Sequence, residues 1–206
     1  MRYPSGIGGL SNLDSLDLSI NMLGGPITGQ IGDCWRLQSL SLSKNYLNGT
    51  IPYQIGNLRA LQDLDLSFNS LMGGIPPWLG SLSDLEYLNL SNNKLNDSVP
   101  TSLGSMVSLI SINLSNNNLD GPLPEGKIFW SATPEAFSNN KDLCGEIQGL
   151  RPCNASVKKK GGGNMKSKLV IIIVASFVGA LSLSIMSVGL FFFISRKEAL
   201  KKYGEG

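Results

Sequence analysis

Residues 37–60, LQSLSLSKNYLNGTIPYQIGNLRA, form one period of a repeat that fills much of the chain. An Asn returns every 24 residues without insertion, at Asn21, Asn45, Asn69, Asn93 and Asn117. Five apolar columns keep the same spacing, among them the column Leu16, Leu40, Leu64, Leu88 and Ile112. Because the same pattern recurs in register, the sequence predicts a stack of similar structural units.

In the L-x-L part of each period, the two leucines point to one side of an extended strand and the middle residue points outward. One period cannot cover its own leucines, so neighbouring periods must stack to form a common core. The pattern L-x-x-L-x-L-x-x-N-x-L at this period is the signature of a leucine-rich repeat. We therefore expect an α/β leucine-rich-repeat solenoid, right-handed, with a parallel β-sheet along its concave side.

The repeated Asn predicts a structural ladder, in which buried amides such as those of Asn69 and Asn93 bond backbone groups where each strand turns away. The Asn is followed by L-x-G-x-I-P, seen as LNGTIP at residues 47–52. Gly supplies a positive φ, and Pro disfavours a regular helix or a central strand. The returning arm of each repeat should therefore be irregular or 3₁₀.

Composition excludes several kinds of chemistry. The chain of 206 residues has no His and only three Cys, which removes the commonest general base and a zinc knuckle. Residues 1–156 hold 8 Lys/Arg and 13 Asp/Glu (8 − 13 = −5), whereas residues 157–206 hold 9 and 2 (9 − 2 = +7). The basic end brackets an apolar run, so it is not a nucleic-acid signature. We expect no catalytic residue, no metal site and no cofactor.

The repeat L-x-x-L-x-L-S-x-N-x-L-x-G-x-I-P-x-x-I-G-N-L resembles the plant-type leucine-rich repeat. Residues 125–153 resemble the segment that closes the ectodomains of plant receptor-like kinases and receptor-like proteins. That segment's motif is matched here by Phe137, Asn140, Leu143, Cys144, Gly145 and Cys153. The resemblance implies an extracellular ligand-recognition domain. In the kinase members a cytoplasmic kinase follows the membrane span, and this chain contains none.

The cysteines divide into a pair and a single residue. Cys144 and Cys153 lie nine positions apart in a segment too small to hold itself, which favours a disulfide over two free thiols. Cys34 occupies an apolar column of the repeat and is expected to be a buried, inert thiol.

The chain divides into several segments. Residues 169–194 carry no charge over 26 positions, whereas about 20 suffice to cross a bilayer, so they predict one transmembrane helix. Residues 1–12 lack the apolar run of a signal peptide and read as the end of a further repeat, from which we expect a fragment or the product of a truncated gene. The expected order is a partial repeat (1–12), five repeats (13–124), a C-terminal cap (125–153), a Lys/Gly linker (154–168), the helix (169–194) and a cytoplasmic tail (195–206).

Five N-x-S/T sequons are present. Together with the Cys pair of the cap and the family resemblance, they predict that residues 1–168 lie outside the cell. Asn48, Asn96 and Asn154 are the better glycosylation candidates. Asn89 and Asn113 arise from the repeat's own LxLS motif and would be crowded on the strand face.

Acidic residues gather at outward positions of the strand motif, at Asp14, Asp17, Asp63, Asp65 and Glu86. Either they form a solvated face that keeps the solenoid soluble, or they form a site for a basic peptide or partner. If they form a site, we expect its centre at Asp63, Asp65, Glu86 and Tyr87.

The hypothesis from sequence is a recognition module anchored in the plasma membrane by a single span, which binds a peptide or protein ligand or a co-receptor ectodomain for cell-surface signalling. One alternative is a fragment of a Ser/Thr receptor kinase whose catalytic domain is encoded downstream. Another is a polygalacturonase-inhibitor-like wall protein, against which the predicted span argues because such inhibitors are soluble.

Overall fold

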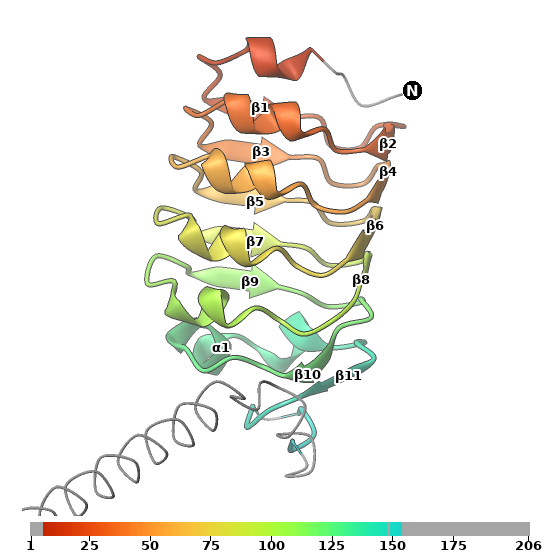
Figure 1. Cartoon of the computed structure of the whole chain (residues 1–206). Helices are drawn as coiled ribbons and strands as arrows, with labels where there is room; N and C mark the ends of the chain where they lie inside the picture. Colours follow the sequence, from red (N-terminus) through yellow and green to blue (C-terminus); the bar gives the residue numbers. More distant parts are fainter. Residues whose placement is uncertain (1–5, 148, 154–206) are drawn as a thin grey trace, which may run out of the picture. The chain divides into compact units, whose positions relative to one another are not determined.

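The computed structural model describes residues 6–147 and 149–153, which belong to one compact unit (Figure 1). The predicted linker, transmembrane helix and tail lie outside these residues, as does Asn154. Among the residues described, no helix is both long and apolar enough to cross a membrane.

A five-stranded parallel sheet runs the length of the stack, with one strand from each repeat (Figure 1). Its strands, in order across the sheet, are β1 (Ser15–Asp17), β3 (Ser39–Ser41), β5 (Asp63–Asp65), β7 (Tyr87–Asn89) and β9 (Ser111–Asn113). Each strand faces residues one period away, as Leu40 faces Leu64. The leucine-rich-repeat fold with its parallel sheet is thereby confirmed, because the L-x-L part of each repeat forms a strand that pairs in register with its neighbour.

A second sheet was not expected from the sequence. It consists of β2 (Gly24–Pro26), β4 (Tyr46–Gly49), β6 (Ser70–Gly73) and β8 (Lys94–Leu95), and Figure 1 shows it along one edge of the stack. The returning arm therefore starts as a strand, and the expectation of a wholly irregular or 3₁₀ arm is wrong. Each strand is short because the chain turns at a residue of positive φ, as at Gly49 (73°) and Gly73 (79°).

The rest of the returning arm is 3₁₀, as expected. The short 3₁₀ helices are η1 (Ile7–Gly9), η2 (Gly29–Asp33), η3 (Tyr53–Asn57), η4 (Pro77–Ser81) and η5 (Thr101–Ser105). The glycine of the I-G-N-L motif lets successive 3₁₀ helices stack closely. A Cβ at Gly32 would lie 2.5 Å from the carbonyl oxygen of Gln54, so a side chain there would push the two repeats apart.

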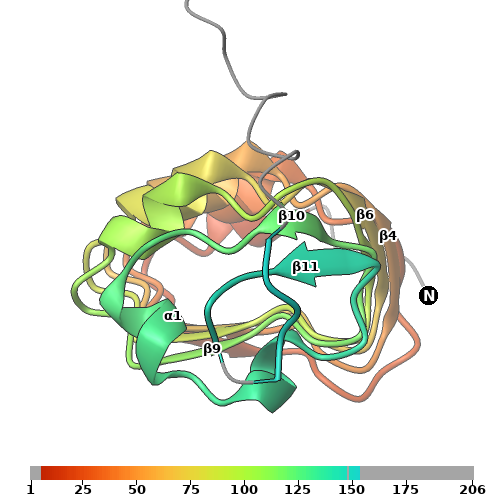
Figure 2. The same ribbon diagram turned by 90° about the horizontal axis from the view of Figure 1, so that it is seen from below.

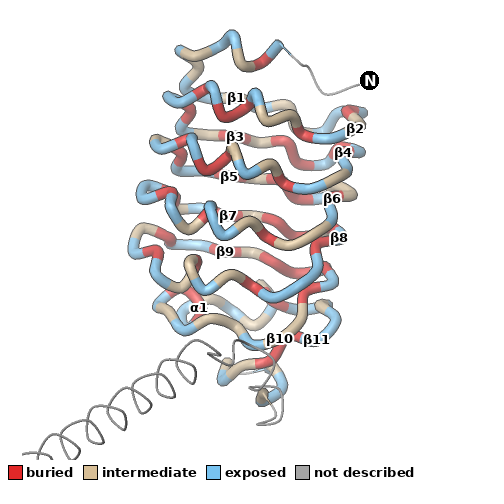
Figure 3. Tube along the Cα trace, viewed as in Figure 1, coloured by how far each residue is buried: buried red, intermediate tan, exposed pale blue. Residues whose placement is uncertain are grey.

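The leucine columns form one continuous core that runs through the stack (Figure 3). Leu37, Leu61 and Leu85 are fully buried because a repeat covers them on each side. The equivalent Leu13 is only partly buried, as are Leu16 and Leu18 of the same repeat. The inner repeats therefore carry most of the buried apolar surface.

The predicted Asn ladder ties each repeat to the one before it. The Asn93 amide oxygen accepts the N–H of Leu71 (3.0 Å), and its nitrogen donates to the carbonyl of Leu66 (3.0 Å) and to carbonyls of its own repeat. Asn45, Asn69 and Asn117 repeat this arrangement.

Two members of the ladder differ from the expectation. Asn69 is half-buried and not buried, although its hydrogen bonds are kept. Asn21 is exposed, and its amide nitrogen bonds only the carbonyls of Leu18 and Ser19 in its own repeat. Asn140, in the cap, takes the next ladder position by accepting the N–H of Leu119 at 3.1 Å.

The cap closes the C-terminal end of the core, as seen along the stack in Figure 2. It comprises α1 (Lys127–Ser131), η6 (Pro134–Phe137) and β11 (Asp142–Cys144), which pairs with β10 (Asp120–Pro122). The rings of Phe129 and Phe137 are buried with their centres 5.9 Å apart. These large side chains cover the leucines of the last repeat, which no further repeat covers within the described residues.

We predict that Asn93→Ala lowers the free energy of unfolding by about 2 kcal/mol. The change leaves the N–H of Leu71 buried without a partner, at about 1–3 kcal/mol for such a group, whereas the carbonyl of Leu66 still accepts a hydrogen bond from the Asn69 amide (3.2 Å). The matched change Asn21→Ala should cost less than about 1 kcal/mol, because that side chain is exposed and bonds no other repeat. Denaturant titration of both variants checks this; equal losses would show that the ladder does not couple the repeats.

We predict that Thr28→Pro stabilises the protein by about 0.4–1 kcal/mol. Thr28 has φ −80° and ψ 146°, close to the values of Pro52 (−69°, 138°) at the same place in the next repeat. Its hydroxyl is also buried without a hydrogen-bond partner. Thermal unfolding of Thr28→Pro and Thr28→Ala separates the two effects, since Ala removes the hydroxyl without restricting φ. A lower midpoint for the Pro variant would contradict the prediction.

Candidate functional site

The exposed side of the five-stranded sheet, here called the outer sheet face, carries the acidic residues singled out in the sequence. In β5, Asp63 is exposed, Leu64 is buried and Asp65 is half-buried, as expected for side chains that alternate across a strand. The register places Asp63 opposite Tyr87 and Asp65 opposite Asn89 on β7. Glu86 directly precedes β7, so the structure brings the four predicted residues together on two adjacent strands.

The carboxylates on this face differ in the hydrogen bonds and ion pairs that they form. Within the described residues, Asp63 and Glu86 make no side-chain hydrogen bond or ion pair. Asp65 accepts the N–H of Ser67 at 2.9 Å, which fixes its orientation. Tyr87 is 46% exposed beside them. Two free carboxylates, one oriented carboxylate and an exposed aromatic ring are therefore presented side by side.

The two acidic residues nearer the N-terminus have partners of their own. Asp14 forms an ion pair with Arg36 (3.5 Å) in which both side chains are about half exposed. Hydrogen bonds from the Ser19 hydroxyl, and then from the Ser19 N–H (2.8 Å), hold the pKa of Asp17 below its ordinary value. Of these acidic residues only Asp14 is paired with a cation within the described ranges; Asp17 keeps its charge and is oriented by Ser19 as Asp65 is by Ser67.

The strands at Asp63, Asp65 and Glu86 and their neighbours present no cation on the outer sheet face. The residues at the outward positions of β3, β5, β7 and β9 include no Lys or Arg. Ile110, which the sequence reasoning missed, stands one period after Glu86 and is 62% exposed. Its place in the outward column of the repeat was the signal that could have found it. The face thus combines acidic groups with exposed apolar surface.

The sequons fall into two structural groups. Asn48 in β4 and Asn96 just after β8 are exposed, and neither side chain makes a hydrogen bond within the described part of the chain. Asn89 and Asn113 are half-buried neighbours in register on β7 and β9. The side-chain oxygen of Asn89 accepts both the N–H (3.2 Å) and the hydroxyl (2.8 Å) of Ser91. Strands only about 4.8 Å apart leave no room for two glycans side by side.

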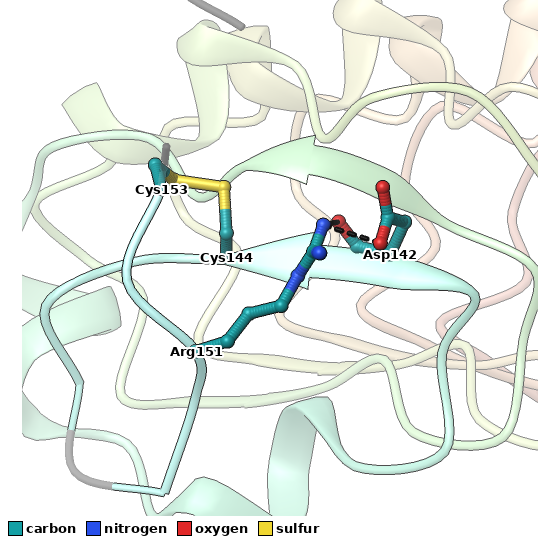
Figure 4. Close-up of polar contacts among 4 residues, drawn as sticks. All are labelled: Asp142, Cys144, Arg151 and Cys153. Carbon is teal, nitrogen blue, oxygen red and sulfur yellow. Dashed lines mark hydrogen bonds and ion pairs between the residues drawn. A yellow bond between two sulfur atoms is a disulfide. The ribbon is translucent and has the colours of Figure 1, made fainter. Parts of the chain in front are cut away.

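The cap is held by covalent and ionic contacts (Figure 4). Cys144 and Cys153 form a disulfide with their Cα atoms 4.9 Å apart. Arg151, between them in sequence, forms an ion pair with Asp142 and donates to the Asp142 carbonyl oxygen at 3.1 Å. Cys34 is a buried free thiol whose pKa is raised, first by burial and then by the charge of Asp33, so it is held in its unreactive protonated form.

The residue types of the outer sheet face limit its chemistry. In residues 6–147 and 149–153, no cluster of three or more Cys, Asp or Glu could hold a metal ion. No Ser–His–Asp set can form on the outer sheet face, because the chain contains no His. What the face can do is bind through charge, hydrogen bonds and apolar contact.

Comparison with known proteins agrees with the fold. Profiles of the leucine rich repeat family match residues 36–58, 60–82 and 76–119. The chain is 39% identical over 70 residues to MDIS1-interacting receptor like kinase 2 of Arabidopsis thaliana, covering 32% of this chain and 6% of that protein. It therefore spans only a small part of the length of this relative.

Solved structures extend the comparison. The ectodomain of the receptor kinase GASSHO1/SCHENGEN3 from Arabidopsis thaliana, in complex with CASPARIAN STRIP INTEGRITY FACTOR 2, is 43% identical with a TM-score of 0.70, covering 74% of this chain and 18% of that chain. The BIR3–SERK2 complex from Arabidopsis thaliana matches at 39% identity and a TM-score of 0.62, covering 68% of this chain and 73% of that chain. The Arabidopsis receptor kinase HAESA, in complex with the peptide hormone IDA and the co-receptor SERK1, matches at 34% identity and a TM-score of 0.63. The match covers 71% of this chain and 24% of that chain.

The repeats, the parallel sheet and these matches define a leucine-rich-repeat protein. More specifically, the chain belongs to the family of plant leucine-rich-repeat receptor ectodomains.

Proposed function

We propose that this chain is the extracellular recognition module of a plant receptor-like kinase or receptor-like protein, and that the outer sheet face binds a peptide or protein partner for cell-surface signalling. The observation that carries the proposal is the group of Asp63, Glu86 and Tyr87, exposed or half-buried on adjacent strands with both carboxylates unpaired. Groups left unpaired on a rigid sheet need no rearrangement before they bind a partner.

The chemistry of the face selects its partner. Carboxylates with no neighbouring cation favour Lys or Arg side chains, and opposite charges speed the encounter of two proteins. Tyr87 and Ile110 offer apolar contact beside that charge. The ligand that fits is a basic segment with apolar side chains, carried by a peptide or by a co-receptor ectodomain. The solved complexes of GASSHO1/SCHENGEN3 and HAESA support a role of this kind.

The proposed module is anchored in the plasma membrane. The uncharged run at residues 169–194 is long enough to span a bilayer; Lys precedes it, and Arg and Lys follow it. We assign residues 1–168 to the outside of the cell and 195–206 to the cytoplasm. In this arrangement repeats occupy residues 13–124, a cap occupies 125–153, and a linker at 154–168 joins the cap to the membrane.

Replacing the centre of the outer sheet face by residues from sister repeats should abolish this binding. The variant Asp63→Ser, Asp65→Ser, Glu86→Gln and Tyr87→Ser uses side chains found at equivalent positions 39, 41, 38 and 111, so the fold is preserved. We expect its affinity for a short Lys/Arg-rich probe peptide to fall at least about tenfold, or about 1.4 kcal/mol.

The salt dependence of probe binding should fall with the affinity, because it reports the same charges. A control variant with Glu125→Ser and Glu146→Ser removes two exposed acidic residues of the cap and should bind as the parent does. Unchanged affinity and unchanged salt dependence in the face variant would exclude the outer sheet face as the binding site.

Translocation into microsomes behind an added signal sequence tests the topology. The chain should stay with the membranes in alkaline carbonate and carry glycans at Asn48 and Asn96, since both are exposed. Asn48→Gln and Asn96→Gln should each remove one glycan step on a gel, whereas Asn89→Gln and Asn113→Gln should remove none. Release of the chain by carbonate would refute the span, and loss of a glycan in the Asn89 or Asn113 variant would refute the crowding argument.

A further inference from the structure

The residue just before the ladder Asn adopts a left-handed backbone conformation in every repeat. The residues at this position have φ between 53° and 55°, and they are Ile20, Lys44, Phe68, Asn92, Asn116 and Asn139. Asn tolerates this conformation well, whereas bulky and especially β-branched side chains do not. The three C-terminal members are Asn, so the repeat itself shows which residue suits the position.

The first three repeats carry Ile20, Lys44 and Phe68 at this position in place of Asn. Ile20 is 73% exposed and Phe68 is 50% exposed, so neither side chain is buried in the core. An exposed apolar side chain in a left-handed conformation adds backbone strain and leaves apolar surface in water. Asn would suit the backbone better on both counts. Exposed apolar side chains that the local backbone does not favour point to a binding role.

These three residues form a continuous surface. The N–H of Ile20 bonds the carbonyl of Ser43, directly before Lys44, and the N–H of Lys44 bonds the carbonyl of Ser67, directly before Phe68, both at 2.9 Å. The Lys44 ammonium lies 5.9 Å from the centre of the Phe68 ring. Tyr46, two residues after Lys44, is 67% exposed. We call Ile20, Lys44, Tyr46 and Phe68 the apolar ridge.

The ridge differs in charge from the outer sheet face. Lys44 is its only ionic group, and in the described part of the chain Lys44 forms no ion pair. The outward residues of β3 in the same repeat are Ser39 and Ser41; Asp17 and Asp65 lie opposite Ser41 on the neighbouring strands, and neither forms an ion pair with Lys44 among the described residues. A partner that covers the ridge must therefore supply both apolar side chains and a carboxylate.

We propose that the apolar ridge is a docking surface for a partner protein segment that presents Leu or Phe side chains together with an Asp or Glu. The apolar side chains pack on Ile20, Tyr46 and Phe68, and the carboxylate pairs with Lys44 over the Phe68 ring. This partner chemistry is opposite in charge to the basic ligand of the outer sheet face. The two surfaces therefore take different partners, or different parts of one partner.

The test uses the full chain in lipid nanodiscs and two synthetic peptides, one alternating Leu and Phe with Asp, the other identical but with Lys for Asp. The ridge variant Ile20→Asn with Phe68→Asn, and the single variant Lys44→Asn, install the residue that the sister repeats carry. We expect the acidic peptide to bind the parent chain, and we expect each variant to bind this peptide with an affinity at least tenfold lower. The thermal midpoint of the ridge variant should stay unchanged or rise, because strain is relieved.

Several outcomes would overturn the proposal. No binding of the acidic peptide, or affinity unaffected by the ridge variant, would show that the ridge is not the site. A lower thermal midpoint in the ridge variant would show that the side chains serve the fold. Self-association of the parent chain that the ridge variant abolishes, measured by sedimentation, would identify a second copy as the occupant. As a control, Asp63→Ser with Asp65→Ser should leave the affinity for the acidic peptide intact. The same variant should lower the affinity for the basic peptide if the outer sheet face binds basic ligands.

Discussion

The structure depends on one constraint, which is that no repeat can bury its leucines or satisfy its backbone alone. Leu61 and Leu85 are buried because repeats cover them on both sides. The Asn ladder applies the same rule to hydrogen bonds, because the amide of Asn93 bonds backbone groups of the preceding repeat as well as its own. Stability in such a stack is therefore a sum of interactions between neighbours, and a change in one inner repeat weakens two interfaces.

The two ends of the described stack differ in how their leucines and ladder Asn are covered. At the C-terminal end, the cap replaces the missing neighbour with Phe129 and Phe137, and Asn140 continues the ladder. The disulfide and the Arg151–Asp142 ion pair hold a segment with little core of its own. In the first repeat Leu13 is only partly buried and Asn21 is exposed, because fewer groups cover them within the described residues.

A repeat protein provides internal controls for separating function from structure. At the core, ladder and turn positions the copies largely agree, and the shared residue is the one that suits the local structure. Where one copy departs, the structure shows whether the departure serves the fold. Asp97 takes the place of a turn glycine at φ 64° in the fourth repeat, and Asp tolerates that conformation. Ile20 and Phe68 have no such explanation, and the unpaired Asp63 and Glu86 lie where sister repeats carry Ser and Gln.

The sequence by itself determined the period, the leucine-rich-repeat fold, the place of each main strand in the L-x-L part of its repeat and the 3₁₀ segments, because these follow from local patterns that repeat in register. Only the tertiary structure decided what depends on neighbours. The second sheet pairs residues 22 positions apart, as Gly24 with Tyr46, so the 24-residue period did not reveal it. The tertiary structure also decided which carboxylates stay unpaired, because Asp14 meets Arg36 from the far end of its own repeat, whereas Asp63 meets no cation among the described residues. Burial and pairing depend on which groups folding brings together, and a linear pattern does not specify those neighbours.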